Sequence, residues 1–471
     1  IAPQVGGEEF VSTLISYLGR INYTYREKYL FQFNIRRDGS SNFGKNNKYG
    51  NFPSASVGWR ISEEPFLKNN TPWINDLKLR ASYGTVGNQA IPPYEIQQFI
   101  NPNVTYVLGA DQSIVPGSTS VRLTNPNLRW ESKTQFDVGI DAVFLNNRLT
   151  LTADYFHARS TDLLTRVPIP LTAGSAGDNP FENIASMQNQ GVELALGFND
   201  SRRDGQFSYS LFGTFTAVRN KVLGLVPDNG NQPIFGWGGV TRTAIGRPVG
   251  EFFLLRREGI FQTQEEINNS PQKGQATPGD VRWKDVDGNG VFDAQADREY
   301  AGSPFPNFEY SLNATANYRG FDLTAYFYGL QGSSIFSPMA FWAARYNDNG
   351  NYRTDDPFWT GPGTSNTNPK PVLGDRTTNA VFYSDRWLEP GSYFRLRNLQ
   401  VGYTLPTALL NRTKAFRSVR VYVAAQNLFT ITKYRWYNPE VVGPDSILGR
   451  SIDDGSYPGS RVLTGGLQIG F

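Results

Sequence analysis

The sequence predicts an all-β protein, and within that class an antiparallel transmembrane β-barrel. Three observations lead to this fold class: apolar and polar residues alternate along many segments, short and long connections alternate between these segments, and the last segment ends on an aromatic residue. The composition agrees, because aromatic residues make up 14% of the chain and charged residues only 18%.

The alternation is clear in residues 134–144. Phe136 and Val138 occupy even positions, whereas Asp137 and Asp141 occupy odd ones. Successive side chains of a strand point to opposite faces, so one face is apolar and the other carries carboxylates, as in a strand between lipid and a polar lumen. The same reasoning predicts roughly 13 strands, at about 11–26, 28–37, 52–62, 76–87, 129–145, 148–160, 187–199, 206–220, 308–319, 321–335, 393–405, 416–432 and 461–471.

The connections between these strands fall into two classes. Short turns, such as Asn146-Asn147-Arg148 and Tyr318-Arg319-Gly320, alternate with much longer segments. Outer-membrane barrels have short periplasmic turns and long extracellular loops in this order. We therefore expect all of 1–471 to belong to a single barrel, with long extracellular loops at about 88–128, 161–186, 221–307, 336–392 and 433–460.

The last predicted strand carries a second signal. Thr464 and Gly466 share one face, and Ile469 and Phe471 lie on the other. This arrangement resembles the C-terminal signal that the barrel-assembly machinery reads. The alternative is an ordinary edge strand that happens to end the chain.

Several functional classes are disfavoured by residue counts. The chain has no cysteine, which excludes disulfides and thiolate metal sites, and its one histidine, His157, makes common hydrolase chemistry improbable. A net charge of +3 gives no electrostatic footprint for nucleic acid. Regularly spaced carboxylates such as Asp137, Asp141 and Asp154 favour pore lining over a glycosidase pair. We therefore expect no enzyme activity.

Six segments carry a family resemblance: 17–23 (YLGRINY), 36–44 (RRDGSSNFG), 52–62 (FPSASVGWRIS), 79–89 (LRASYGTVGNQ), 394–403 (FRLRNLQVGY) and 425–430 (AQNLFT). In this order they resemble the SusC/RagA-like branch of the TonB-dependent transporters of the Bacteroidota. The resemblance implies an outer-membrane barrel of about 22 strands with an N-terminal plug in its lumen. The chain would then be the C-terminal portion, without the plug, the TonB box and the first strands.

The resemblance also implies a function and partners. A SusD-like surface lipoprotein would cover the extracellular mouth, TonB would act through the missing N-terminal region, and the barrel would sit in outer-membrane lipid. The function would be active import of a nutrient, an oligosaccharide or an oligopeptide. The alternatives are a passive outer-membrane porin and a secreted β-rich glycan-binding protein.

One loop predicts a calcium site. Oxygen ligands at loop positions 1, 3, 5 and 9 and a glycine at position 6 match the pattern of a calcium-binding loop. Position 12 departs from it, because Ala296 stands there and Asp297 comes one place late. The alternative is a solvated turn rich in Asp, Asn and Gly. The candidate ligands are Asp285, Asp287, Asn289, Val291 and Asp293.

Large aromatic residues in the predicted loops form the second set of site candidates. Aromatic faces stack on sugar rings and anchor protein interfaces, so these residues are candidates for contact with the substrate or with the SusD-like lipoprotein. Others would belong to the aromatic girdle at the membrane interface. The candidates are Trp237, Phe341, Trp342, Tyr346 and Trp436.

Overall fold

The computed structural model describes residues 9–120, 123–166, 179–202, 206–225, 232–345, 357–374, 378–410, 416–443 and 447–471. The chain divides into two compact units: residues 1–147, 152–192 and 220–232 form the first, and residues 148–151, 193–219 and 233–471 form the second. Among the residues described, no helix combines the length and the apolar character needed to cross a membrane.

Thirteen strands form the main sheet, in the order β1-β2-β3-β4-β7-β8-β9-β10-β17-β18-β21-β22-β23. Every predicted strand segment overlaps one of them, so the all-β prediction is confirmed. The order begins at β1 and ends at β23, which leaves the sheet open over the described part of the chain. The strands are β1 (Leu14–Tyr25), β2 (Tyr29–Ser40), β3 (Tyr49–Arg60), β4 (Ile74–Asn88), β7 (Glu131–Phe144), β8 (Leu149–Arg166), β9 (Phe181–Ser201), β10 (Phe207–Gly224), β17 (Phe308–Tyr318), β18 (Phe321–Gln331), β21 (Tyr393–Thr404), β22 (Ser418–Thr432) and β23 (Val462–Gly470).

Consecutive strands pair as antiparallel hairpins. Strand β17 pairs with β18 from Phe308↔Gln331 to Tyr318↔Phe321, and the turn between them has only two residues. Both have positive φ, 47° at Arg319 and 90° at Gly320, as a tight primed turn requires. A Cβ at Gly320 would also lie 2.7 Å from the carbonyl oxygen of Thr404, so backbone packing and turn geometry both favour glycine here.

The apolar face of the main sheet is exposed. On β22 and β23, Val421, Val423, Leu467 and Ile469 are between 41% and 62% exposed. A sheet of a soluble protein buries its apolar face in a core, whereas a membrane barrel turns it toward lipid. The exposed apolar face is therefore the feature of the fold that fits a membrane.

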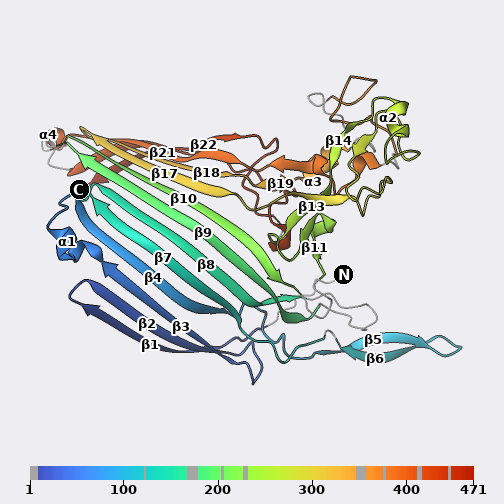
Figure 1. Ribbon diagram of the computed structural model, residues 1–471, viewed down its shortest axis with the longest axis horizontal. Coiled ribbons are helices and arrows are strands. Elements are labelled where there is room, and N and C mark those ends of the chain that lie inside the picture. The colour runs from blue at the N-terminus through green and yellow to red at the C-terminus, as the bar shows by residue number, and fades with distance from the viewer. Residues whose placement is uncertain are drawn as a thin grey trace. The chain divides into compact units, whose positions relative to one another are not determined.

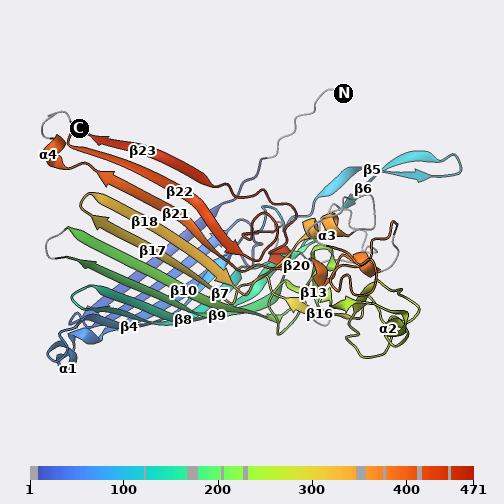
Figure 2. The same cartoon turned by 90° about the horizontal axis from the view of Figure 1, so that it is seen from above.

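The first unit carries a few elements besides its strands of the main sheet. A one-turn helix α1 (Pro65–Lys68) follows the 3-10 turn Ile61–Glu63, and the hairpin β5 (Ile100–Leu108) and β6 (Ser113–Ser120) extends from the other end of its strands (Figures 1 and 2). The hairpin lies within the predicted loop 88–128, where no strand was expected. A small core in the same unit is formed by Phe43, Phe52, Ile91, Leu128 and Trp130.

The second unit contains a folded loop subdomain, formed by the described residues of 233–307, 332–392 and 433–461. It gathers at one end of β17, β18, β21 and β22, and α4 (Thr407–Leu410) lies at the other end (Figures 1 and 2). Its elements are β11 (Ile234–Gly236), β12 (Thr241–Thr243), β13 (Glu251–Leu255), β14 (Arg257–Ile260), α2 (Gln264–Asn268), β15 (Val281–Trp283), β16 (Arg298–Gly302), β19 (Ser334–Phe336), α3 (Pro338–Ala344), β20 (Leu388–Pro390) and 3-10 turns at Trp237–Gly239, Thr378–Ala380, Asp385–Trp387 and Ile447–Gly449.

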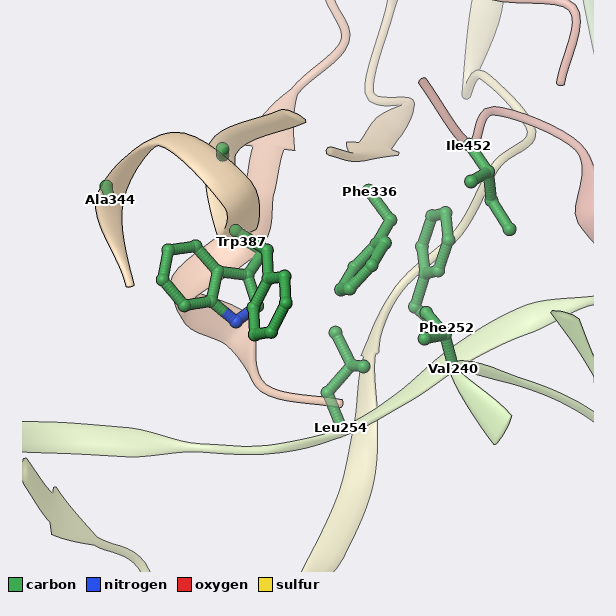
Figure 3. Packing of buried hydrophobic residues seen from close by; sticks show 9 residues of the cluster. Val240, Phe252, Leu254, Phe336, Ala344, Trp387 and Ile452 are labelled. Carbon is green, nitrogen blue, oxygen red and sulfur yellow. The ribbon is translucent and has the colours of Figure 1, made fainter. Parts of the chain in front are cut away.

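The loop subdomain has hydrophobic cores of its own. Phe252 and Leu254 of β13, Phe336 of β19 and Trp387 pack together with at most 1% of their surface exposed (Figure 3). A second cluster surrounds Trp283 of β15. Residues that the sequence predicts as loop are thus packed as a small soluble domain, and this packing gives the region a defined shape.

Candidate functional site

A charged network lies on the polar face of the first unit. Arg80 of β4 contacts three carboxylates: Nη1 lies 3.3 Å from Asp137, Nε lies 3.1 Å from Asp141, and Nη2 lies 2.6 Å from Asp154. Lys78 adds a contact of 2.9 Å to Asp141. All five side chains are between 12% and 33% exposed. The network therefore ties β4, β7 and β8 together on the face opposite the exposed apolar groups.

A glycine makes this network possible. Gly139 of β7 lies opposite Arg80 in the ladder, and a Cβ on it would come within 2.1 Å of an Asp154 carboxylate oxygen. The prediction that Asp137, Asp141 and Asp154 share one polar face agrees with these contacts. The role of Arg80 as their common partner was missed, because alternation assigns a residue to a face but not to a cross-strand partner. Such a network suits the wall of a polar lumen and has no nucleophile with a neighbouring base.

The aromatic candidates have different environments. Trp342 of α3 is 61% exposed, whereas its neighbour Phe341 is only 8% exposed and stacks edge-on against Phe382 and Trp387. The prediction that Phe341 contacts the substrate or the SusD-like lipoprotein needs correcting. Its ring stabilises the core of the loop subdomain and is not available for contact with either. Trp237 and Trp436 are partly buried and pack against the same core. Tyr346 lies outside the described residues.

The predicted calcium loop has one more acidic residue than expected. Carboxylate oxygens of Asp285, Asp287 and Asp297 lie within 4.8 Å of one another. Asp297 is fully buried, and it accepts hydrogen bonds from the backbone N–H groups of Val286 and Asp293, both at 2.8 Å. The carboxylate that the sequence places one position late is thus folded back to the cluster. Calcium binding by this loop stays a prediction.

The backbone of the calcium loop is ordered by its own carboxylates. The amide N–H groups of Gly290 and Gly288 donate to Asp285 at 2.9 and 2.8 Å, and they hold the pKa of Asp285 below its usual range. The N–H groups of Gln295 and Ala296 lower the pKa of Asp293 in the same way. Backbone donors favour the ionised form, which is the form that binds a hard cation.

The C-terminal strand carries the predicted assembly signal. Gly466 pairs with Tyr422, whose ring would lie 2.3 Å from a Cβ at this position, so the glycine leaves room for the tyrosine ring. Thr464 pairs with Ala424, and Ile469 pairs with Val419. Phe471 is 79% exposed and contacts the ring of Phe416 at 5.7 Å. Recognition of Thr464, Gly466, Ile469 and Phe471 by the barrel-assembly machinery stays a prediction.

A further ion cluster, not found from sequence, fixes the segment after β22 to β21. Glu440 accepts hydrogen bonds from Tyr393 at 2.7 Å and from Arg395 at 2.5 Å, and it also contacts Arg397. Arg395 reaches Asn438 at 2.7 Å as well. Arg395 and Arg397 lie on either side of Leu396 within β21, and this alternation gives no indication that both meet a carboxylate more than 40 positions away.

Comparison with known proteins identifies the fold. The family described as TonB dependent receptor-like, beta-barrel matches residues 12–428. The chain belongs to this family. TonB-dependent receptor P3 of Formosa agariphila is 34% identical over 97% of the chain, and SusC of Bacteroides thetaiotaomicron is 27% identical over 98%. The solved structure of the RagAB peptide transporter aligns over 97% of the chain with 25% identity and a TM-score of 0.80.

These relatives place the chain in the SusC/RagA-like branch of the TonB-dependent receptors, as the six sequence segments indicated. The chain is therefore an outer-membrane protein of the kind found in the Bacteroidota. It spans 45% of the length of receptor P3, 44% of SusC and 48% of the matched RagAB chain. The relatives are receptors and transporters.

Proposed function

We propose that the chain forms the C-terminal part of the barrel of a TonB-dependent importer, which takes up an oligosaccharide or an oligopeptide together with a SusD-like lipoprotein. One observation carries this proposal: a sheet of the TonB-dependent receptor family has an exposed apolar face, a charged opposite face and a folded loop subdomain at one end of its strands. These three surfaces suit lipid, a water-filled lumen and an extracellular contact.

In this proposal the chain carries out no bond chemistry. The main sheet provides a rigid wall, the Arg80 network lines part of the lumen, and the loop subdomain provides the surface that meets the lipoprotein or the solute. The plug and the TonB contact belong to the remainder of a longer polypeptide, in keeping with relatives about twice as long as the chain. We therefore propose that the protein is not an enzyme.

The first experiment tests the assembly. The protein is extracted from native membranes in mild detergent, and all proteins that co-migrate are identified by mass spectrometry. We expect a SusD-like lipoprotein, and plug-domain peptides from the same polypeptide as this chain. A polypeptide without a plug would support a passive porin. A soluble protein with no lipid-facing surface would support the secreted glycan-binding alternative.

The second experiment tests active transport. Cells take up a labelled oligosaccharide or oligopeptide that supports growth, with and without a protonophore that abolishes the inner-membrane proton gradient. Energised import requires the gradient, so uptake should fall to the level of a strain that lacks the gene. Uptake that persists without the gradient would be diffusion through an open pore and would overturn the importer proposal.

A further inference from the structure

Arg242 of β12 lies among aromatic rings of the loop subdomain. Its guanidinium lies 4.4 Å from the ring centroid of Phe253 and 5.6 Å from that of Phe235. Its Nε is buried without a hydrogen-bond partner, and no hydrogen bond or ion pair joins Arg242 to another residue in the part of the chain that the structure describes. A buried N–H group of a guanidinium that has no acceptor is unfavourable beside apolar rings.

The carboxylate best placed to neutralise Arg242 is engaged elsewhere. Glu251 of β13 lies opposite Arg242 in the ladder. Both of its carboxylate oxygens accept hydrogen bonds from Arg247, at 2.6 and 2.9 Å. Some other arginines of the loop subdomain have acidic partners, as in the pair of Arg257 with Asp385. The positive charge of Arg242 is therefore left without an anion.

Arg298 of β16 adds a second uncompensated charge at the same rings. Its guanidinium lies 5.2 Å from the centroid of Phe253 and 5.3 Å from that of Phe235. Its hydrogen bonds go to neutral oxygens: the carbonyl of Gly239 and the side chain of Gln295, each at 3.1 Å, and the carbonyl of Gln295 at 3.4 Å. Burial lowers the pKa of Arg298, and the nearby charge of Arg242 lowers it further. The two arginines repel each other, and an anion bound between them would relieve that repulsion.

The residues around the two arginines limit the kind of molecule that can carry this anionic group. Phe235 is 48% exposed and offers a ring face beside both arginines, whereas Phe252 and Leu254 on the other face of β13 are fully buried in the core. Arg242 and Arg298 place two charges on the same two rings, and Arg242 also lies 5.8 Å from the ring centroid of Tyr300. A specific protein interface buries about 1,200 Å² or more, so this compact group suits a single anionic group with an apolar face more than a protein partner.

We propose that Arg242 and Arg298 bind the carboxylate or sulfate group of the imported solute, with Phe235 stacking on the body of the same solute unit. Guanidinium groups recognise such planar or branched anions through paired hydrogen bonds. The proposal rests on the importer function and narrows the substrate to an acidic oligomer. Acidic saccharides and peptides with a free C-terminal carboxylate share this chemistry.

The experiment measures binding to the full-length native complex in detergent by isothermal titration calorimetry. The probes are three matched pairs that differ in one charge: trigalacturonate and its methyl ester, a sulfated disaccharide and its unsulfated form, and a tetrapeptide with a free or an amidated C-terminus. We expect the charged member of at least one pair to bind about tenfold more tightly than its neutral partner. The pair that shows the preference identifies the source of the anion.

Three variants test the residues. Arg242→Gln should abolish the charge preference, Arg298→Gln should reduce it, and Arg242→Lys should retain part of it. Arg282→Gln is the matched control, because Arg282 lies in the same subdomain and has an acidic partner, Glu258, at 3.6 Å, and it should leave the preference unchanged. Resistance of each variant to limited proteolysis shows that its loop subdomain is folded.

The outcomes separate this inference from the importer proposal. Equal binding of charged and neutral probes by the wild type, or a preference that survives Arg242→Gln, would overturn the anion site even if uptake depends on the proton gradient. Loss of the co-purifying lipoprotein in Arg242→Gln would also overturn it, because Arg242 would then be a protein contact. A charge preference without gradient-dependent uptake would sustain the site and defeat the importer proposal.

Discussion

The main sheet and the loop subdomain of the second unit place their apolar residues in opposite ways. On β22, Val423 is 62% exposed, whereas Leu254 of β13 in the loop subdomain is fully buried. The sheet is held by its ladder and leaves its apolar side chains exposed, whereas the subdomain is held by a core, as in a soluble protein. Apolar residues are therefore exposed in one region and buried in the other. The same type of substitution should affect stability differently in the two regions.

The largest expected effect comes from emptying the core of the loop subdomain. Trp387 is 1% exposed, and its Nε1 donates to the carbonyl oxygen of Val381 at 2.9 Å. Trp387→Ala should destabilise the subdomain by about 3–5 kcal/mol, as for other large-to-small core changes. Limited proteolysis of the membrane-inserted protein should then cleave within 233–307 or 332–392, while the barrel keeps its resistance to unfolding in detergent.

Trp342→Ala provides the matched control. Trp342 is 61% exposed, so its removal should change stability by less than about 0.5 kcal/mol. If Trp387→Ala instead unfolded the barrel along with the subdomain, the two regions would be one cooperative unit and the comparison would fail.

A charge on the apolar face of the sheet should have the next largest effect. Val423→Arg places a guanidinium where the proposed function puts lipid, and the expected loss is about 2–4 kcal/mol at mid-membrane depth. Fractionation should show less folded protein in the outer membrane. Val442→Arg, at a site 87% exposed in the loop subdomain, should be tolerated. Equal tolerance of both substitutions would mean that the exposed valines of β22 do not face lipid.

The difference between the main sheet and the loop subdomain also explains which strands can be predicted from the sequence. A lipid-facing strand is long and alternates strictly, so all thirteen strands of the main sheet were predicted, including β22 and β23 with boundaries within a few residues. The short strands of the loop subdomain, such as β12 with three residues, are too brief to show a period. The hairpin of β5 and β6 was missed because its alternation is interrupted by Asn and Pro.

The candidate sites can be predicted from the sequence only in part, because some of their residues meet through tertiary contacts. Composition identified the Asp-rich loop, but not the return of Asp297 to it, which depends on the hydrogen bonds of that carboxylate to the backbone at Val286 and Asp293. The sequence predicts the loop aromatic residues as contacts of the substrate or the lipoprotein, but the burial of Phe341 depends on tertiary packing that the one-dimensional pattern does not contain. Arg242 was not singled out, because a lone arginine is typical of a solvated strand.

Removing one carboxylate from the predicted calcium loop should have a smaller effect on the protein than Trp387→Ala or Val423→Arg. Asp285→Asn should weaken calcium binding by about tenfold or more, because affinity of such loops follows the number of charged ligands. Calcium-dependent resistance of the loop to proteolysis measures the effect. Asp454→Asn, an exposed carboxylate outside the loop, is the control. If calcium does not change the protease resistance of the loop even in the wild type, the solvated-turn alternative would be favoured.

The smallest expected effect is the pH dependence of the same loop. Backbone N–H groups hold the pKa of Asp285 and of Asp293 below the ordinary value, which is about 3.9 for an unfolded chain. A lowered pKa in the folded state stabilises the loop above the ordinary pKa, and this stabilisation is lost as the pH falls through the lowered pKa. Protease resistance of the loop in a calcium-free buffer should therefore stay constant from pH 7 to about pH 5 and decline below about pH 4. Asp285→Asn should flatten this decline. A loop whose resistance begins to fall near neutral pH would be controlled by other groups, and the carboxylate-to-backbone bonds would not be what orders it.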